Sequence, residues 1–327
     1  MLSKLKSKIE HAHFAEQLNR WSYRLGLPGA SFDIQSDRPV LGVETVNELI
    51  IEAILNQKPV LFSRLGSIET ETAMIGLHRH TAYQKKLVNM YTKGIAMAYN
   101  PVRRRIKINA GVFPTTNQGL DEFSRIYSNS IQYADYLIDW KFIRNHRRLM
   151  DESHYQGGLI SGIPIITNDN TWSKYLQGKK VLVIHPFKDA IVKQYKIREK
   201  LFADTRVLPE FELVCIKAVL SNGTQEVPFR SWTEALQFMQ QEIEKVDFDV
   251  AIIGAGAYGL PLGAYIKEYF MKPVIHIGGG LQLLFGIMGK RWDQTIFGIE
   301  YYNEWWVRPS EQETPKGANL IEGATYW

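Results

Sequence analysis

Cysteine is almost absent from this chain of 327 residues, in which Cys215 is the only one. A single thiol excludes internal disulfides and thiolate metal clusters, and it fits a reducing compartment. Cys215 lies in the apolar segment of residues 211–219, so we predict that it is a buried core residue.

Long apolar runs are missing too. No segment reaches the roughly 18 uninterrupted apolar residues of a membrane-spanning helix, and residues 1–11 lack the apolar stretch of a secretory signal. We therefore expect a cytoplasmic protein. Residues 2–25 carry apolar side chains at near-helical spacing with several lysines, so we predict a helical extension over residues 1–42. We expect it to pack on the rest of the chain, and a helix lying on the inner face of the membrane stays open as the alternative.

The sequence also lacks a strong excess of either charge. Lys and Arg number 39 against 34 Asp and Glu, which gives a formal net charge of +5. This mild excess favours small anionic partners such as nucleotides and phosphates, and we predict no nucleic-acid partner. The one short basic run, Arg103-Arg104-Arg105, is expected to form a solvated face.

What the chain does contain is an alternation of strand and helix patterns. The expected strands are residues 59–63, 136–139, 180–185, 212–219, 249–254 and 273–277. The expected helices are residues 43–56, 67–77 (capped by Ser67), 118–134, 189–202, 231–246 and 258–270. Strands that are apolar on both faces indicate an α/β fold with a Rossmann-like, mostly parallel sheet and helices on both faces. We predict one such domain over residues 43–327.

Ligands of such sheets bind at the carboxyl ends of the strands, so the loops that follow the strands hold the candidate site. Residues 254–259 match the pattern G-x-G-x-x-G, which makes Gly254, Gly256 and Tyr258 candidates for phosphate binding. A dinucleotide site would need an acidic residue about 20 positions further on. His276 stands near that place, which disfavours a dehydrogenase. Glycines that only permit a tight turn are the other alternative.

A second glycine-rich turn begins at Gly278 and Gly279. It is followed by Gln282, Lys290 and Arg291, and together with the first turn it predicts a cradle for a diphosphate. The alternative for the two cations is an exposed helix end.

After the strand of residues 180–185 come two further candidates for phosphate contact, His185 and Lys188. A capping or packing role is the alternative for His185.

The loop after the first core strand supplies a carboxylate. Arg64 and Gly66 open the turn, and Glu69 follows at the start of a helix, from which it can reach the same cleft as a general base. The alternatives are a capping-type contact for Glu69 and an internal salt bridge for Arg64.

No metal ligands are predicted. The pattern Asp247-Phe-Asp249 resembles a D-x-D metal motif, but it precedes a strand, so we interpret it as a turn at the wrong end of the sheet. The pairs His11/His13 and His78/His80 lack the spacing and carboxylate partners of a zinc site.

The segment Arg64-Leu-Gly66-Ser67-Ile-Glu69 resembles the R-x-G-x-x-E motif of the bacterial glycosyltransferases of the GT-D fold, and residues 277–292 resemble a run found in such proteins. The resemblance implies transfer of a sugar from a UDP- or dTDP-sugar to a glycan or lipid-linked acceptor in surface polysaccharide synthesis. It implies that Glu69 is the acidic active-site residue.

One position departs from that family. Its better-known members carry D-x-E in this segment and use a divalent cation, Mn²⁺ or Mg²⁺, whereas Ser67 stands at the first acidic position here. The departure puts a metal cofactor in doubt, and we expect fixed cations to stabilise the departing diphosphate instead. The candidates are Arg64, Lys188, Lys290 and Arg291. Two alternative functions stay open: a pyruvyltransferase-like enzyme that modifies polysaccharide, and a non-catalytic nucleotide-binding module.

Overall fold

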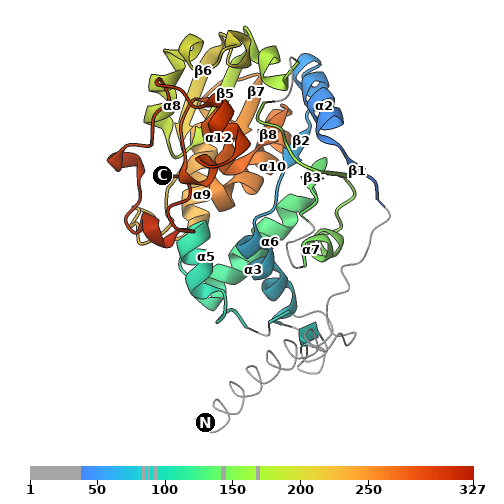
Figure 1. Cartoon of the computed structure of the whole chain (residues 1–327). Coiled ribbons are helices and arrows are strands. Elements are labelled where there is room, and N and C mark those ends of the chain that lie inside the picture. Colours follow the sequence, from blue (N-terminus) through green and yellow to red (C-terminus); the bar gives the residue numbers. More distant parts are fainter. Residues whose placement is uncertain are drawn as a thin grey trace, which may run out of the picture.

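A parallel sheet of eight strands, in the order β1-β4-β3-β2-β8-β7-β5-β6, forms the centre of the computed structural model (Figure 1). The structure describes residues 38–80, 82, 86, 89–90, 95–96, 98–140, 145–166 and 170–327. Every strand pair is parallel. The predicted α/β, Rossmann-like fold is therefore confirmed. The predicted extension lies mostly outside the described residues.

The strands are short. They are β1 Val40–Leu41, β2 Leu61–Ser63, β3 Tyr136–Ile138, β4 Gly158–Ile160, β5 Lys180–His185, β6 Glu212–Lys217, β7 Val250–Ile253 and β8 Val274–His276. The α-helices are α2 Val43–Leu55, α3 Ser67–His78, α5 Arg103–Ala110, α6 Asn117–Ile131, α7 His146–Glu152, α8 Lys188–Tyr195, α9 Trp232–Glu244, α10 Gly259–Phe270, α11 Leu281–Leu284 and α12 Ile296–Tyr301. The 3₁₀ turns are η1 Trp172–Leu176, η2 Arg198–Lys200, η3 Thr205–Val207, η4 Gly256–Tyr258, η5 Gly278–Gly280, η6 Lys290–Trp292, η7 Glu311–Glu313 and η8 Ala318–Leu320.

Alternate residues of each central strand enter two separate cores. In β5, Leu182 and Ile184 pack with α3, α5, α6, α7, α9 and α10, whereas Val181 and Val183 pack with α2, α8 and α11. Side chains of a strand point alternately to its two faces, so helices on both sides require apolar residues at every position. This double burial explains the continuous apolar strand sequences.

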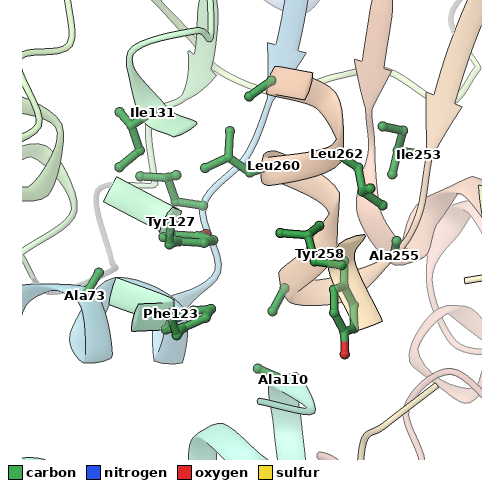
Figure 2. Close-up of a cluster of buried hydrophobic side chains, with 14 of the residues drawn as sticks. Ala73, Ala110, Phe123, Tyr127, Ile131, Ile253, Ala255, Tyr258, Leu260 and Leu262 are labelled. Atoms are coloured by element: carbon green, nitrogen blue, oxygen red, sulfur yellow. The ribbon is translucent and has the colours of Figure 1, made fainter. Parts of the chain in front are cut away.

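The first core joins the α3–α6 pair to the end of β7. Figure 2 shows Phe123 and Tyr127 of α6 in one cluster with Tyr258 and Leu260, and all four side chains are buried. The ring of Phe123 stacks on Tyr127 at 5.3 Å and meets Trp232 edge-on at 5.0 Å. This packing holds the start of α3 close to the loop that follows β7.

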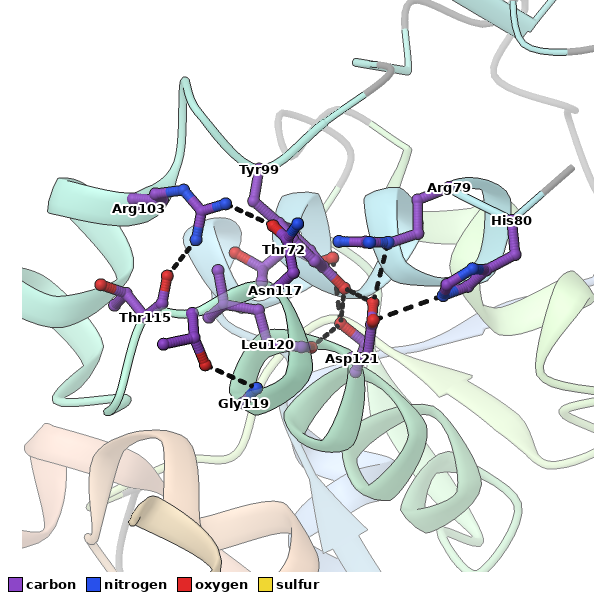
Figure 3. A network of polar contacts seen from close by, with 12 residues as sticks. Thr72, Arg79, His80, Tyr99, Arg103, Thr115, Asn117, Gly119, Leu120 and Asp121 are labelled. Carbon is purple, nitrogen blue, oxygen red and sulfur yellow. Dashed lines mark hydrogen bonds and ion pairs between the residues drawn. The ribbon is translucent and has the colours of Figure 1, made fainter. Parts of the chain in front are cut away.

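A polar network fixes the other end of α3 (Figure 3). Asp121 of α6 accepts a hydrogen bond from the Tyr99 hydroxyl at 2.8 Å and lies 3.3 Å from both Arg79 and His80. Arg103, at the start of α5, donates to the Thr115 carbonyl and to the Asn117 side chain. The network thus ties α3, α5 and α6 into one unit.

The basic run of α5 only partly forms the solvated face that we predicted. Arg104 and Arg105 are exposed, as expected. Arg105 forms an ion pair with Glu71 at 3.0 Å. Arg103 departs from the prediction because it is half-buried against the start of α6.

Several predicted boundaries need correction. The sheet begins at Val40, before the predicted boundary at residue 43, because β1 pairs with β4. Residues 158–160, for which no strand was predicted, form β4. Gly66, not Ser67, is the N-cap of α3, and no side chain caps that helix. Cys215 is only half-buried because β6 is an edge strand, and burial raises the pKa of its thiol to about 12.

Candidate functional site

A cavity of about 170 Å³ lies at the carboxyl ends of β2, β5, β7 and β8. Ten of the predicted site residues line it: Arg64, Gly66, Glu69, His185, Gly254, Gly256, Gly278, Gly279, Gln282 and Arg291. The loops that follow four neighbouring strands thus meet at one place, as the rule for open parallel sheets predicts.

Glu69 lies in the first turn of α3, where its side chain folds back over the helix start. A side chain at Gly66 would collide with it, because a Cβ atom there would lie 2.1 Å from Oε2 of Glu69. The amide of Gly66 donates to the Tyr127 hydroxyl at 3.1 Å. Glycine at position 66 therefore gives the carboxylate its place in the cavity.

Burial raises the pKa of the Glu69 carboxyl above its ordinary value. A hydrogen bond from its own backbone amide and the charge of Arg64 act against this shift, and the charge of Glu322 adds to it. Desolvation dominates because an ionised carboxylate loses the solvation that water provides. Glu69 thus accepts from its own amide and does not cap the helix at Gly66, and its side chain lines the cavity.

Arg64 follows β2 and lies between that strand and the turn after β8. Its guanidinium is 5.4 Å from the centre of the Trp140 ring. A Cβ atom at Gly278, where φ is +78°, would lie 3.0 Å from Nη1 of Arg64. Within the described part of the chain no carboxylate pairs with Arg64, so the internal salt bridge that we considered is not found there. The guanidinium is available to an anion.

His185 ends β5 and is 3% exposed. Its Nδ1 accepts a hydrogen bond from the backbone amide of Phe187 at 3.0 Å, and burial lowers its pKa to about 3. A neutral imidazole whose Nδ1 accepts must carry its proton on Nε2. His185 therefore offers a neutral N–H donor, and no hydrogen bond to Nε2 is found in the described part of the chain.

His276 ends β8 and is also buried. Its Nδ1 lies 2.7 Å from the hydroxyl oxygen of Ser63. Burial, and then the charge of Arg64, lower its pKa to about 3. Like His185 it is uncharged at neutral pH, so among the described residues the positive side chains that line the cavity are the arginines Arg64 and Arg291.

The two glycine turns approach each other closely. A Cβ atom at Gly254 would lie 2.7 Å from the Gly278 carbonyl oxygen and 2.5 Å from Cδ2 of His185. Gly256, at φ +53°, has open space where its Cβ would be. Backbone without side chains lets a ligand approach the main chain, which is the geometry that phosphate cradles use.

Three predicted site residues do not line the cavity. Tyr258 is buried in the core, where its ring stacks on Trp232 at 5.0 Å and its hydroxyl lies 3.1 Å from that of Ser221. Lys290 donates to the Gly323 carbonyl at 3.3 Å. Lys188 begins α8, and its charge acts against the burial that raises the pKa of the Cys215 thiol on the edge strand. For Tyr258 and Lys290, the direction of the side chain and not the position in sequence decides whether the residue reaches the cavity.

Arg291 does line the cavity, but its guanidinium is engaged. Nη2 forms an ion pair with Glu322 at 2.5 Å, and Nη1 donates to the Tyr326 hydroxyl at 3.2 Å. Both partners belong to residues 321–327, which sequence reasoning did not connect to the site.

The sequence analysis also missed an amide-bearing wall of the cavity. Nδ2 of Asn222 donates to the Asn109 carbonyl at 2.6 Å, which ties the loop after β6 to α5. Both residues line the cavity. Only their spatial pairing marks them, because α5 and this loop are more than a hundred residues apart in the sequence.

In the described part of the chain no group of three or more His, Cys, Asp or Glu side chains could hold a metal ion. Asp247 and Asp249 lie at the amino end of β7, as predicted, where Asp249 accepts from the Lys180 amide at 2.8 Å and Asp247 pairs with the Lys180 side chain.

Among the described helices none is long and apolar enough to cross a membrane. Comparison with protein-family models, curated proteins and solved structures finds no match to this chain.

Proposed function

We propose that the protein is a glycosyltransferase of the GT-D type that uses a UDP- or dTDP-sugar and a glycan or lipid-linked acceptor. One observation carries the proposal: a carboxyl of raised pKa, Glu69, lies in one cavity with Arg64, which pairs with no carboxylate of the described residues, and two glycine turns form the wall. A cleft that combines a perturbed carboxyl with fixed cations is typical of an active site.

In the proposed reaction, Glu69 acts as the general base. The acceptor hydroxyl gives its proton to the Glu69 carboxylate while its oxygen forms a bond to the anomeric carbon of the donor sugar. The bond from that carbon to the diphosphate oxygen breaks, and the diphosphate leaves with the electron pair. A raised pKa makes Glu69 a stronger base than an ordinary carboxylate, which suits this role.

The departing diphosphate requires stabilisation of its growing negative charge. Arg64 supplies a guanidinium, His185 an Nε2–H donor, and the turn at Gly278 backbone amides, all fixed before the reaction. Preorganised donors of this kind stabilise charge without having to reorient. We propose that they take over the work of a divalent cation, because Ser67 stands where the resembling family carries an acidic residue.

A thermal-shift screen tests this function. The purified protein is heated with UDP, dTDP, GDP, CMP, NAD or phosphoenolpyruvate, each with Mn²⁺ and with EDTA, since a ligand that binds the native state raises its stability. We expect a shift with one nucleoside diphosphate that survives EDTA, followed by sugar transfer from the matching donor. A shift with NAD or phosphoenolpyruvate alone contradicts the proposal. Nucleotide binding without turnover favours a non-catalytic module.

A further inference from the structure

Residues 322–327, here named the strap, form one wall of the cavity and are held by the residues that a donor would use. The Arg291 amide donates to the Thr325 carbonyl at 2.9 Å, and Nε2 of Gln282 donates to the Tyr326 carbonyl at 3.2 Å. Nε1 of Trp327 donates to the Glu313 carbonyl at 3.0 Å. The strap thus rests on two residues of the cavity wall and on η7.

The side chains of the strap cover the second glycine turn and bind Arg291. The Tyr326 ring covers Gly279, since a Cβ atom there would lie 2.2 Å from Cε1 of the ring. Arg291 lies 4.9 Å from the centre of that same ring and pairs with the Glu322 carboxylate. A carboxylate paired with a guanidinium occupies the same fork of donors that a phosphate would use.

The backbone of the strap is strained. Glu322, Gly323 and Ala324 all have left-handed φ values, of 47°, 72° and 62°. Only glycine adopts this region readily. Glu322 and Ala324 are not glycine, so their left-handed conformation is imposed by the surrounding structure. Tyr326 and Trp327 also pack against the second core, whereas Glu322 is held by its ion pair with Arg291. A strained segment of this kind can shift when the polar contact is lost.

We propose that the strap latches the donor site, with Glu322 occupying Arg291 until an anionic ligand displaces it. The inference rests on the proposed function only in taking the ligand to be a diphosphate. The Glu322 carboxylate already acts on Glu69 across the cavity, so a bound diphosphate adds charge to a region that holds two carboxylates. Release of Glu322 removes this repulsion and frees the guanidinium.

Titration calorimetry with inorganic pyrophosphate in EDTA tests the latch on the full chain. Glu322→Gln removes the competing charge and keeps the side-chain shape, and Glu304→Gln removes one charge from an exposed position outside the cavity. The Arg291–Glu322 pair is about 40% exposed on each side, so its loss should tighten binding about two- to fivefold. Glu304→Gln should bind pyrophosphate as the unaltered protein does.

Hydrogen exchange of backbone amides is a second, independent test of the latch. The Arg291 amide, which donates to Thr325, should exchange faster in the unaltered protein once pyrophosphate is bound. Unchanged or weaker binding by Glu322→Gln overturns the latch, as does an Arg291 amide that becomes better protected or a complete lack of pyrophosphate binding. Neither measurement depends on sugar transfer. A protein that binds pyrophosphate in this way but transfers no sugar in a separate assay would contradict the proposed function and leave the latch standing.

Discussion

Replacement of Glu69 by Gln should make the protein inactive and more stable at the same time. Because its pKa is raised in the folded state, Glu69 holds its proton more tightly there than in the unfolded chain. The stability that this proton contributes is present below the unfolded pKa and is lost as the pH rises through the folded pKa. Glutamine is neutral at every pH, so Glu69→Gln should melt at a higher temperature than the unaltered protein at pH 8. The difference should shrink as the pH falls toward the ordinary value of 4.5, below which the carboxyl is protonated in both states.

The effect on turnover follows from the loss of the base. A positioned general base contributes about 10²- to 10⁴-fold to the rate, so the turnover number should fall by that factor. Donor affinity should change by less than about threefold, since glutamine has nearly the same shape and Arg64 remains in place. A loss of turnover together with a gain in stability is the expected trade-off at an active-site group.

The assay combines sugar transfer, donor binding by calorimetry and thermal melts at pH 5 and pH 8. Glu71→Gln is the matched control, because Glu71 lies on the same helix in an exposed ion pair with Arg105. Its loss should change stability by less than about 1 kcal/mol and leave turnover intact. Near-normal turnover in Glu69→Gln would refute the assignment of the base, and a lower melting temperature at pH 8 would refute the reasoning on its burial.

Three further variants probe the rest of the site. Arg64→Ala should weaken donor binding and turnover about 10- to 100-fold, whereas Arg104→Ala, at an exposed position, should change neither. If calorimetry showed the same donor affinity for both variants, Arg64 would not be a donor-binding residue. His185→Asn should weaken UDP binding about tenfold. Because the pKa of His185 is about 3, the UDP affinity of the unaltered protein should show no histidine titration between pH 5 and pH 8. A histidine titration in that range would contradict the neutral state of His185. Gly278→Ala should lower both the melting temperature and donor affinity because Arg64 lies against it, while Gly178→Ala, at a similar φ of +72° but in open space, should lower only the melting temperature.

The fold could be predicted where a strand is buried on both faces. The bounds of β5 were predicted as observed, because four consecutive apolar residues, 181–184, enter the two cores alternately. The strand β1 was missed because two residues carry no recognisable period. The strand β4 was missed because the glycines and the proline around it are typical of a loop. The short α7 was missed as well, since seven residues offer barely two turns of helical pattern.

The candidate site divides in the same way. Strand ends predicted Glu69, Arg64 and His185 correctly as cavity residues, because the topology alone brings those loops together. Tyr258 was wrongly predicted because its ring turns into the core, although Gly254 and Gly256 of the same motif line the cavity. The strap was not foreseen, because its contacts with Arg291 depend on a chain path that no local pattern encodes.

The glycine motif at residues 254–259 illustrates why such a pattern does not identify a ligand. Gly254 leaves room for the His185 ring and Gly259 for the His276 ring, where a Cβ atom would lie 2.1 Å from Nε2. Gly254 and Gly259 are therefore required by the packing of buried imidazoles from neighbouring strands, and not by a ligand. Only Gly256 has a left-handed φ with open space around it. The same spacing can thus arise from side-chain packing, and the residues that end the adjacent strands tell the two causes apart.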